Sequence, residues 1–170
     1  MSCRIYVACQ MSGRDKAEMV SRAKYVCSIL RQYGLDPISP VIAEGVANEK
    51  GPLTQTSEAQ LQYFWKRDKE IITEQAHVVL VDEAFRKSHG VERELGLARY
   101  CLWIPLVIVA PGLGISIPRL EDDIVAEDVH EAGRLIRDKF GTWPKRVLWR
   151  LKLLNRTLPL FIYRQILAFR

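Results

Sequence analysis

Short apolar runs rich in β-branched residues alternate along this chain with longer stretches whose apolar residues recur at steps of three and four. The first pattern predicts buried β-strands, and the second predicts amphipathic helices. The predicted strands cover residues 4–9, 35–40, 77–82 and 104–112. The predicted helices cover residues 15–34, 57–76, 90–102 and 125–141. Because strands and helices alternate in this way, few arrangements of the chain can bury all the apolar surfaces.

The alternating order, with its short connections, predicts an α/β fold: a doubly wound, mostly parallel sheet of four to five strands with helices on both faces, flavodoxin-like or Rossmann-like. Such sheets bind ligands at the carboxyl ends of their strands. The loops after the first and third predicted strands therefore contain the candidate binding residues. These are Gln10, Met11, Gly13, Arg14, Ser88, His89 and Gly90.

The charge of the chain is unevenly distributed. The 170 residues are enough for one globular core, and their formal net charge is +5. Residues 143–170 contain seven basic residues and no acidic one, whereas residues 1–142 contain 18 basic and 20 acidic residues. We therefore expect an α/β domain over residues 1–142 and a basic amphipathic helical extension over residues 143–170. No nucleic-acid-binding face is expected on the domain.

The extension has apolar residues at steps of three and four and basic residues elsewhere around the predicted helix. It is too short and too basic to span a bilayer. Docking onto the domain or onto a second subunit is the favoured interpretation. The alternatives are that the extension lies on an anionic membrane surface, or that it binds a nucleic acid or a protein partner.

The spacing of the cysteines indicates the redox state of the compartment in which the protein is found. Cys3, Cys9, Cys27 and Cys101 form no Cys-x-x-Cys pair and have no histidine at zinc-finger spacing. This pattern is typical of reduced thiols, and the first nine residues are too short for a secretory signal. We therefore expect a cytoplasmic protein without a structural metal or a cofactor, with the membrane surface as an alternative location through the extension.

Two glutamates lie near the start of the predicted helix 90–102, in the stretch SHGVERELG. Glu94 lies at the edge of the apolar face of this helix, whereas Glu92, about 200° around it, is expected to face solvent. A carboxylate in the first turn is stabilised as an anion by the unpaired amides of the helix, which suits a nucleophile. The alternative is that Glu94 is an ordinary first-turn acid.

Asp68 and Tyr6 are the other candidates for catalysis. Asp68 lies on the sheet-facing side of the predicted helix 57–76, where it could donate a proton to a leaving group. The alternative is a solvated surface charge. Tyr6, in the first strand, could hold Glu94 by a hydrogen bond, although a tyrosine in a strand is usually part of the core.

The loop before the predicted helix 90–102 suits a phosphate group. Ser88 and Gly90 offer a hydroxyl and free backbone amides at the start of a helix. Basic side chains could add charge-assisted contacts, and the candidates are Arg14, or Arg86 with Lys87. The alternatives are an ordinary helix cap and turn for the first two residues and surface charges for the basic ones.

Three motifs, in this order and spacing, resemble the nucleoside 2-deoxyribosyltransferase family, which includes the 2'-deoxynucleoside 5'-phosphate N-hydrolases. They are IYVACQMSG, WKRD and SHGVERELGLA, and the resemblance covers residues 3–110. The resemblance implies a reaction at C1' of a nucleoside or nucleotide, with Glu94 as nucleophile, Asp68 near the base and Tyr6 orienting the nucleophile. It also implies a homodimer or larger homo-oligomer.

The same resemblance bears on the substrate. The transferases commonly carry an aspartate at the position of Ser88, whereas the monophosphate hydrolases carry serine and bind phosphate, so this chain resembles the enzymes of 5'-monophosphates. The loop CQMSG departs from the family and leaves the base preference open, and the charged pair before Glu94 replaces a smaller pair. His89, next to the site, could contact phosphate or be solvated.

The chemistry of N-glycosidic bonds explains these residue types. Breaking such a bond develops positive charge at C1' and negative charge on the base, so a carboxylate below the sugar and a proton source near the base stabilise the transition state. We therefore expect an N-glycosidase or a deoxyribosyltransferase with a retaining glycosyl-enzyme intermediate. The alternatives are a non-catalytic nucleotide-binding or sensor module on the same fold, and a NAD glycohydrolase.

Overall fold

The computed structural model describes residues 2–9, 15–42, 58–82, 89–102, 104–109, 123–142 and 144–148. They form one parallel sheet of five strands in the order β2-β1-β3-β4-β5. The strands are β1 (Arg4–Ala8), β2 (Asp36–Ile38), β3 (Val78–Val81), β4 (Leu106–Val109) and β5 (Ile124–Ala126). This order is that of flavodoxin-like folds, so the predicted fold class is confirmed.

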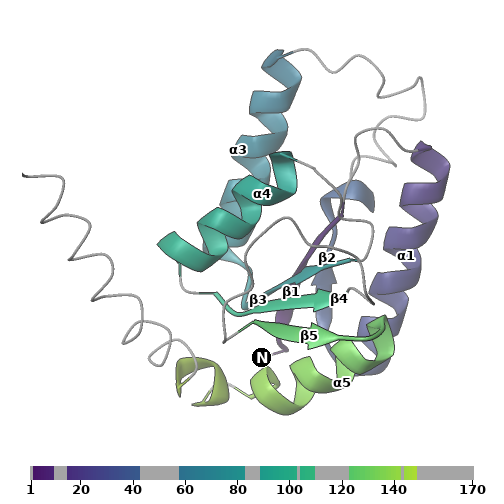
Figure 1. The fold of residues 1–170 in the computed structure, drawn as a ribbon, viewed down its shortest axis with the longest axis vertical. Helices are drawn as coiled ribbons and strands as arrows, with labels where there is room; N and C mark the ends of the chain where they lie inside the picture. The colour runs from purple at the N-terminus through teal and green to yellow at the C-terminus, as the bar shows by residue number, and fades with distance from the viewer. Residues whose placement is uncertain are drawn as a thin grey trace, which may run out of the picture.

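Helices cover both faces of the sheet (Figure 1). They are α1 (Lys16–Gln32), α3 (Glu58–Glu74), α4 (His89–Gly96) and α5 (Val129–Phe140). Helices α1 and α5 pack together on one face, and α3 and α4 pack together on the other. Each face has its own apolar core, because side chains of successive strand residues point to opposite sides.

The alternation along β1 decides which side chains meet which helices. Ile5, Val7 and Cys9 belong to the core beneath α1 and α5. Tyr6 and Ala8 belong to the core beneath α3 and α4. Tyr6 therefore faces the two helices that carry the predicted catalytic carboxylates.

The predicted helix 125–141 begins too early. Residues 124–126 form β5, which pairs with β4, and α5 starts only at Val129. Asp128 is the N-cap of α5, and its carboxylate accepts a hydrogen bond of 2.7 Å from the backbone N–H of Glu131. The cap ends the extended segment and begins the helix, since an N-cap residue has non-helical dihedral angles.

Two other predicted elements differ in detail. The second strand ends at Ile38, and residues 40–42 are already helical. The predicted helix 90–102 begins at His89, and its last turn widens into a π-helical segment, η2 (Leu97–Cys101), in which Leu102 N–H bonds the carbonyl of Leu97 five residues earlier.

The described start of the basic extension packs onto the domain. Residues 144–148 are helical, and the side chain of Arg146 is buried beside Cys3 and donates a hydrogen bond of 3.1 Å to the carbonyl of Phe140. Residues 149–170 lie outside the described residues. Among the helices that the structure describes, none has the length and apolar character needed to cross a membrane.

Candidate functional site

The candidate site lies at the carboxyl ends of β1 and β3. Strand β1 has β2 on one side and β3 on the other, so consecutive crossovers leave it in opposite directions, and such a switch point is where doubly wound sheets bind ligands. Cys9 follows β1 and Asp82 follows β3 at this edge. Helix α4, which carries Glu94, is the next described element after β3.

Glu94 is turned into the molecule, as predicted. Its neighbours along the helix, Val91, Leu95 and Ala98, are buried in the core beneath α3 and α4, and Glu94 itself is only 8% exposed. Glu92 is half-buried rather than facing solvent as expected. Arg93, between the two glutamates, is the exposed residue of the three.

Tyr6 and Glu94 meet across the interface between β1 and α4. The two side chains are hydrogen bonded, with the Tyr6 hydroxyl as donor to the carboxylate. Burial raises the pKa of the Tyr6 hydroxyl well above its ordinary value, and the negative charges of Glu94 and Asp68 raise it further. Tyr6 therefore keeps its proton and remains a donor to Glu94.

Asp68 comes to the same place from α3. It is 9% exposed, and it is close enough to Tyr6 for its charge to affect the pKa of the tyrosine. Burial raises the pKa of the Asp68 carboxyl above its ordinary value, and the neighbouring Arg67 guanidinium opposes that rise without cancelling it. The alternative of a solvated surface charge is therefore wrong for Asp68, and a buried carboxyl with a raised pKa suits a proton donor.

Arg67 is a site residue that the sequence analysis did not select. Its guanidinium donates hydrogen bonds to Asp68. Its positive charge also acts on Tyr6, where it offsets a small part of the rise in the pKa of the hydroxyl. The motif WKRD placed Arg67 beside Asp68 in the sequence. However, consecutive residues on a helix do not ordinarily face each other, so the pattern alone gave no reason to pair them.

A second pair lies on the opposite face of the sheet. Arg22 on α1 donates two hydrogen bonds, of 2.7 and 2.8 Å, to the two carboxylate oxygens of Asp82. The thiol of Cys9 is near enough to both groups of charges to be affected by them: burial raises its pKa, and both Asp82 and Glu94 add to the increase. The position of Asp82 directly after an apolar run was a signal for this residue, whereas nothing in the sequence marked Arg22.

The predicted binding loops fall mostly outside the described residues. This applies to Gln10, Met11, Gly13, Arg14, Arg86, Lys87 and Ser88. His89 and Gly90 begin α4; Gly90 is exposed, and the side chain of His89 is outside the described part of the chain. The phosphate contacts predicted for these residues stay predictions.

The described part of the chain offers no obvious donor set for a metal ion. Within the described residues, no cluster of three or more His, Cys, Asp or Glu side chains could hold a metal ion. All four cysteines carry free thiols, and three of them are buried. Among the described residues, two carboxyls, a phenol and a guanidinium converge at the site.

In this arrangement the two carboxyls can take different chemical roles, one as a nucleophile and the other as an acid. Glu94 accepts a hydrogen bond from the Tyr6 phenol, and a carboxylate held in this way can attack an electrophilic carbon. Asp68, with its pKa raised by burial, is placed as an acid. Pairs of titratable groups whose environments differ in this way are typical of sites that combine a nucleophile with a general acid.

Among solved structures, the chain is similar to a 2-deoxyribosyltransferase from the psychrotolerant bacterium Bacillus psychrosaccharolyticus, described as a biocatalyst for the synthesis of antiviral and antitumoral nucleosides. The two are 21% identical and superpose with a TM-score of 0.55 over 77% of this chain and 90% of the other. The chain has the 2-deoxyribosyltransferase fold. No family model and no curated protein matches it in sequence.

Proposed function

We propose that this protein breaks the N-glycosidic bond of a nucleoside or a nucleoside 5'-monophosphate and passes the sugar either to water or to a second base. The observation that carries the proposal is the meeting of three side chains from three elements. Glu94 on α4 accepts a hydrogen bond from Tyr6 on β1, and Asp68 on α3 lies near the same tyrosine. The fold shared with a 2-deoxyribosyltransferase supports the same chemistry.

Each of the three residues has a role in this reaction. Glu94 attacks C1' and forms a glycosyl ester as the bond to the base breaks. Asp68 gives its proton to the departing base, and Tyr6 holds Glu94 in place. In the second step Asp68, now ionised, takes a proton from water or from an acceptor base, which then displaces Glu94 from C1' with overall retention of configuration.

Base release is the decisive assay. The full chain is incubated with each 2'-deoxynucleoside, its 5'-monophosphate and the matching ribose compounds, and free base is separated by chromatography. We expect release from at least one of these compounds by the wild type and none by Glu94→Gln. Glu92→Gln is the matched control, because it removes a carboxylate two residues away on the same helix, and it should leave the rate within about twofold, as for a residue outside the reacting groups.

Two further measurements separate the alternatives. A 2'-fluorinated substrate slows hydrolysis of the glycosyl ester, so mass spectrometry should find a sugar adduct on the peptide that contains Glu94. Adding a second free base tells transfer from hydrolysis, since a transferase makes a new nucleoside. Tight nucleotide binding without any base release would contradict the proposal in favour of a binding module, and cleavage of NAD alone would indicate a NAD glycohydrolase.

A further inference from the structure

Arg67 and Asp68 form an ion pair that is unusual for their positions. They are consecutive on α3, and consecutive helical residues point about 100° apart. Nevertheless Nε and Nη2 of Arg67 lie 3.3 and 2.9 Å from Oδ1 of Asp68. The Arg67 side chain therefore bends back along the helix surface to reach its neighbour.

Phe64, one helical turn earlier, provides the surface on which Arg67 lies. The guanidinium carbon of Arg67 is 5.6 Å from the centre of the Phe64 ring, within the range of a cation–π contact. The Phe64 ring in turn contacts Tyr63 edge to face, with the ring centres 5.8 Å apart. The Arg67 side chain is 24% exposed, so most of it is held by these contacts.

These two hydrogen bonds from Arg67 end on the same oxygen of Asp68. An oxygen that accepts two N–H groups is a poor place for a proton, so a protonated Asp68 carries its proton on Oδ2. The guanidinium of Arg67 acts on Asp68, and the charges of Glu94, Asp68 and Arg67 all act on the Tyr6 hydroxyl. Of the groups named in these interactions, Arg67 is the cation.

We propose that Arg67 is a positioning residue for the acid: by binding Oδ1 of Asp68 it fixes the carboxyl plane and assigns the transferable proton to Oδ2, which faces the leaving base. This role rests on the proposed function. As the C1'–N bond breaks, its electron pair goes to the base nitrogen, which takes the Oδ2 proton, while Glu94 bonds C1'. Arg67 also limits the rise in the pKa of Asp68, so that the acid can give up its proton and regain it within each turnover.

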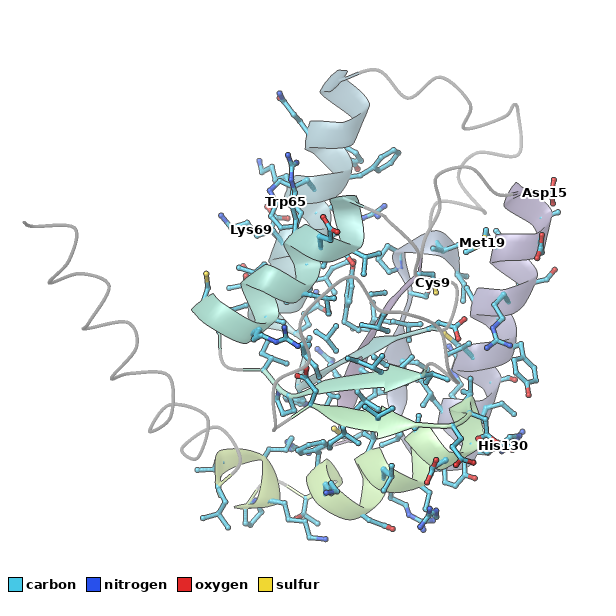
Figure 2. The ribbon with its side chains drawn as sticks, viewed as in Figure 1. Cys9, Asp15, Met19, Trp65, Lys69 and His130 are labelled. Carbon is cyan, nitrogen blue, oxygen red and sulfur yellow. The ribbon has the colours of Figure 1, made fainter. Side chains whose placement is uncertain are left out.

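Three variants test the role. Arg67→Met removes the guanidinium and keeps the length and apolar character of the side chain. Arg67→Lys keeps the positive charge and loses the two-point contact. Lys69→Met is the matched control, because Lys69 is an exposed basic residue of the same helix whose side chain points away from the sheet (Figure 2).

The first measurement needs no turnover. The carboxyl of Asp68 is titrated by carbon-13 NMR in the wild type and in the three variants. We expect the pKa of Asp68 to rise in Arg67→Met, to rise less in Arg67→Lys and to stay unchanged in Lys69→Met. An unchanged pKa in Arg67→Met would overturn the proposal, whether or not the protein releases base.

The second measurement compares leaving groups. A 7-methylated purine leaves without needing a proton, so a variant that has lost only acid positioning should retain nearly wild-type kcat on such a nucleoside. On the unmethylated purine we expect Arg67→Met to lose at least tenfold in kcat with little change in KM, and its activity to persist to higher pH than that of the wild type. Equal losses on both substrates would show a merely structural role and overturn the proposal.

The two measurements also separate this proposal from the proposed function. If the wild type releases no base from any nucleoside or nucleotide, the proposed function fails and the acid role fails with it, even where the NMR titration shows that Arg67 controls Asp68. If base is released and depends on Glu94, but Arg67→Met behaves as the wild type on both purines, only the role of Arg67 is overturned.

Discussion

Arg22 on α1 and Asp82 at the end of β3 are joined by two parallel hydrogen bonds across a separation of 60 residues. The Asp82 side chain is 1% exposed and that of Arg22 is 29% exposed. This geometry, in which each carboxylate oxygen accepts one N–H of the guanidinium, is the strongest form of such a pair. The pair therefore ties α1 to the strand end from which the chain continues toward Glu94.

Loss of Arg22 is expected to destabilise the fold. In Arg22→Met the buried Asp82 carboxylate loses both hydrogen bonds from the guanidinium, which costs about 2–3 kcal/mol, after a reduction for the partial exposure of Arg22. Asp82→Asn in the same background should recover part of the loss, because a buried amide without the guanidinium costs less than a buried carboxylate without it. Urea unfolding measures both variants, and Lys24→Met, at an exposed position of the same helix, should change stability by less than about 0.5 kcal/mol. Equal stability of Arg22→Met and the wild type would rule out this role.

Tyr6→Phe is expected to reduce kcat for base release by more than its loss of folding stability would account for. A hydrogen bond to a charged group contributes about 1.5–3 kcal/mol. If Tyr6 holds Glu94 in its attacking position, kcat for base release should fall by about 10- to 100-fold. Tyr33→Phe, at a ring that packs beside His130 on the other face of the sheet, is the control and should keep wild-type kcat. A Tyr6→Phe variant with wild-type kcat would show that Tyr6 is only a core residue.

Asp68→Asn is expected to lose base-release activity and to be more stable than the wild type at neutral pH. Because the pKa of Asp68 is raised in the folded protein, its contribution to stability is fully present below its ordinary value of 3.8 and is lost as pH rises through the raised value. Asparagine cannot ionise, so the variant should be more stable than the wild type at neutral pH and equal to it at about pH 3. Base release should be lost, because asparagine has no proton to give.

Denaturant unfolding at the two pH values checks the stability of Asp68→Asn. Glu70→Gln, which removes an exposed carboxylate from the same helix, is the control and should show no such difference between the two pH values. A variant that is less stable than the wild type at neutral pH would contradict the assignment of burial as the main influence on Asp68.

Much of the fold followed from local patterns. Long apolar runs and helical periods identify β1, β3, β4, α1 and α3, because these elements each bury a continuous face. Strand β5 was missed because it has three residues, of which the middle one, Val125, is exposed, and it directly precedes a helix. A short edge strand of this kind is recognised only through its pairing with β4, from which residues 110–123 separate it in the chain.

Some features of the candidate site were likewise predictable from local sequence patterns, and others were not. The inward direction of Glu94 was predictable, because it depends only on the helical repeat of α4. The contact between Tyr6 and Glu94 depends on how α4 packs over β1, so the sequence offered it only as an alternative to an ordinary core tyrosine, and the family resemblance then favoured it. The pair of Arg22 and Asp82 joins distant segments, and no local pattern specifies such a contact. Arg67 was overlooked because its bond to the next residue requires a bent side chain that sequence spacing does not reveal.

Gly133 on α5 lies where α5 meets Tyr33 at the end of α1. A Cβ at this position would be 2.5 Å from Cδ2 of the Tyr33 ring. Gly133→Ala should therefore destabilise the fold by about 1–2 kcal/mol, because overpacking outweighs the gain in helix propensity. Gly96→Ala in α4 is the contrasting variant: a Cβ there meets nothing within 4 Å, so it should stabilise the fold by up to about 1 kcal/mol. Thermal unfolding distinguishes the two, and stabilisation by both substitutions would show that Tyr33 moves aside without cost.

Arg146 is expected to hold residues 144–148 on the domain. Its buried guanidinium donates to the carbonyl of Phe140, one of the last carbonyls of α5, and lies beside the buried thiol of Cys3. Loss of a hydrogen bond from a charged group, about 1.5–3 kcal/mol, should speed local opening, and hence amide exchange over residues 144–148, by about 10- to 100-fold in Arg146→Ala. Lys145→Ala is the control, because Lys145 donates to a neighbouring carbonyl, that of Asp138, from an exposed position. Hydrogen exchange followed by mass spectrometry compares the two variants. Unchanged exchange in Arg146→Ala would mean that contacts other than this guanidinium keep the segment in place.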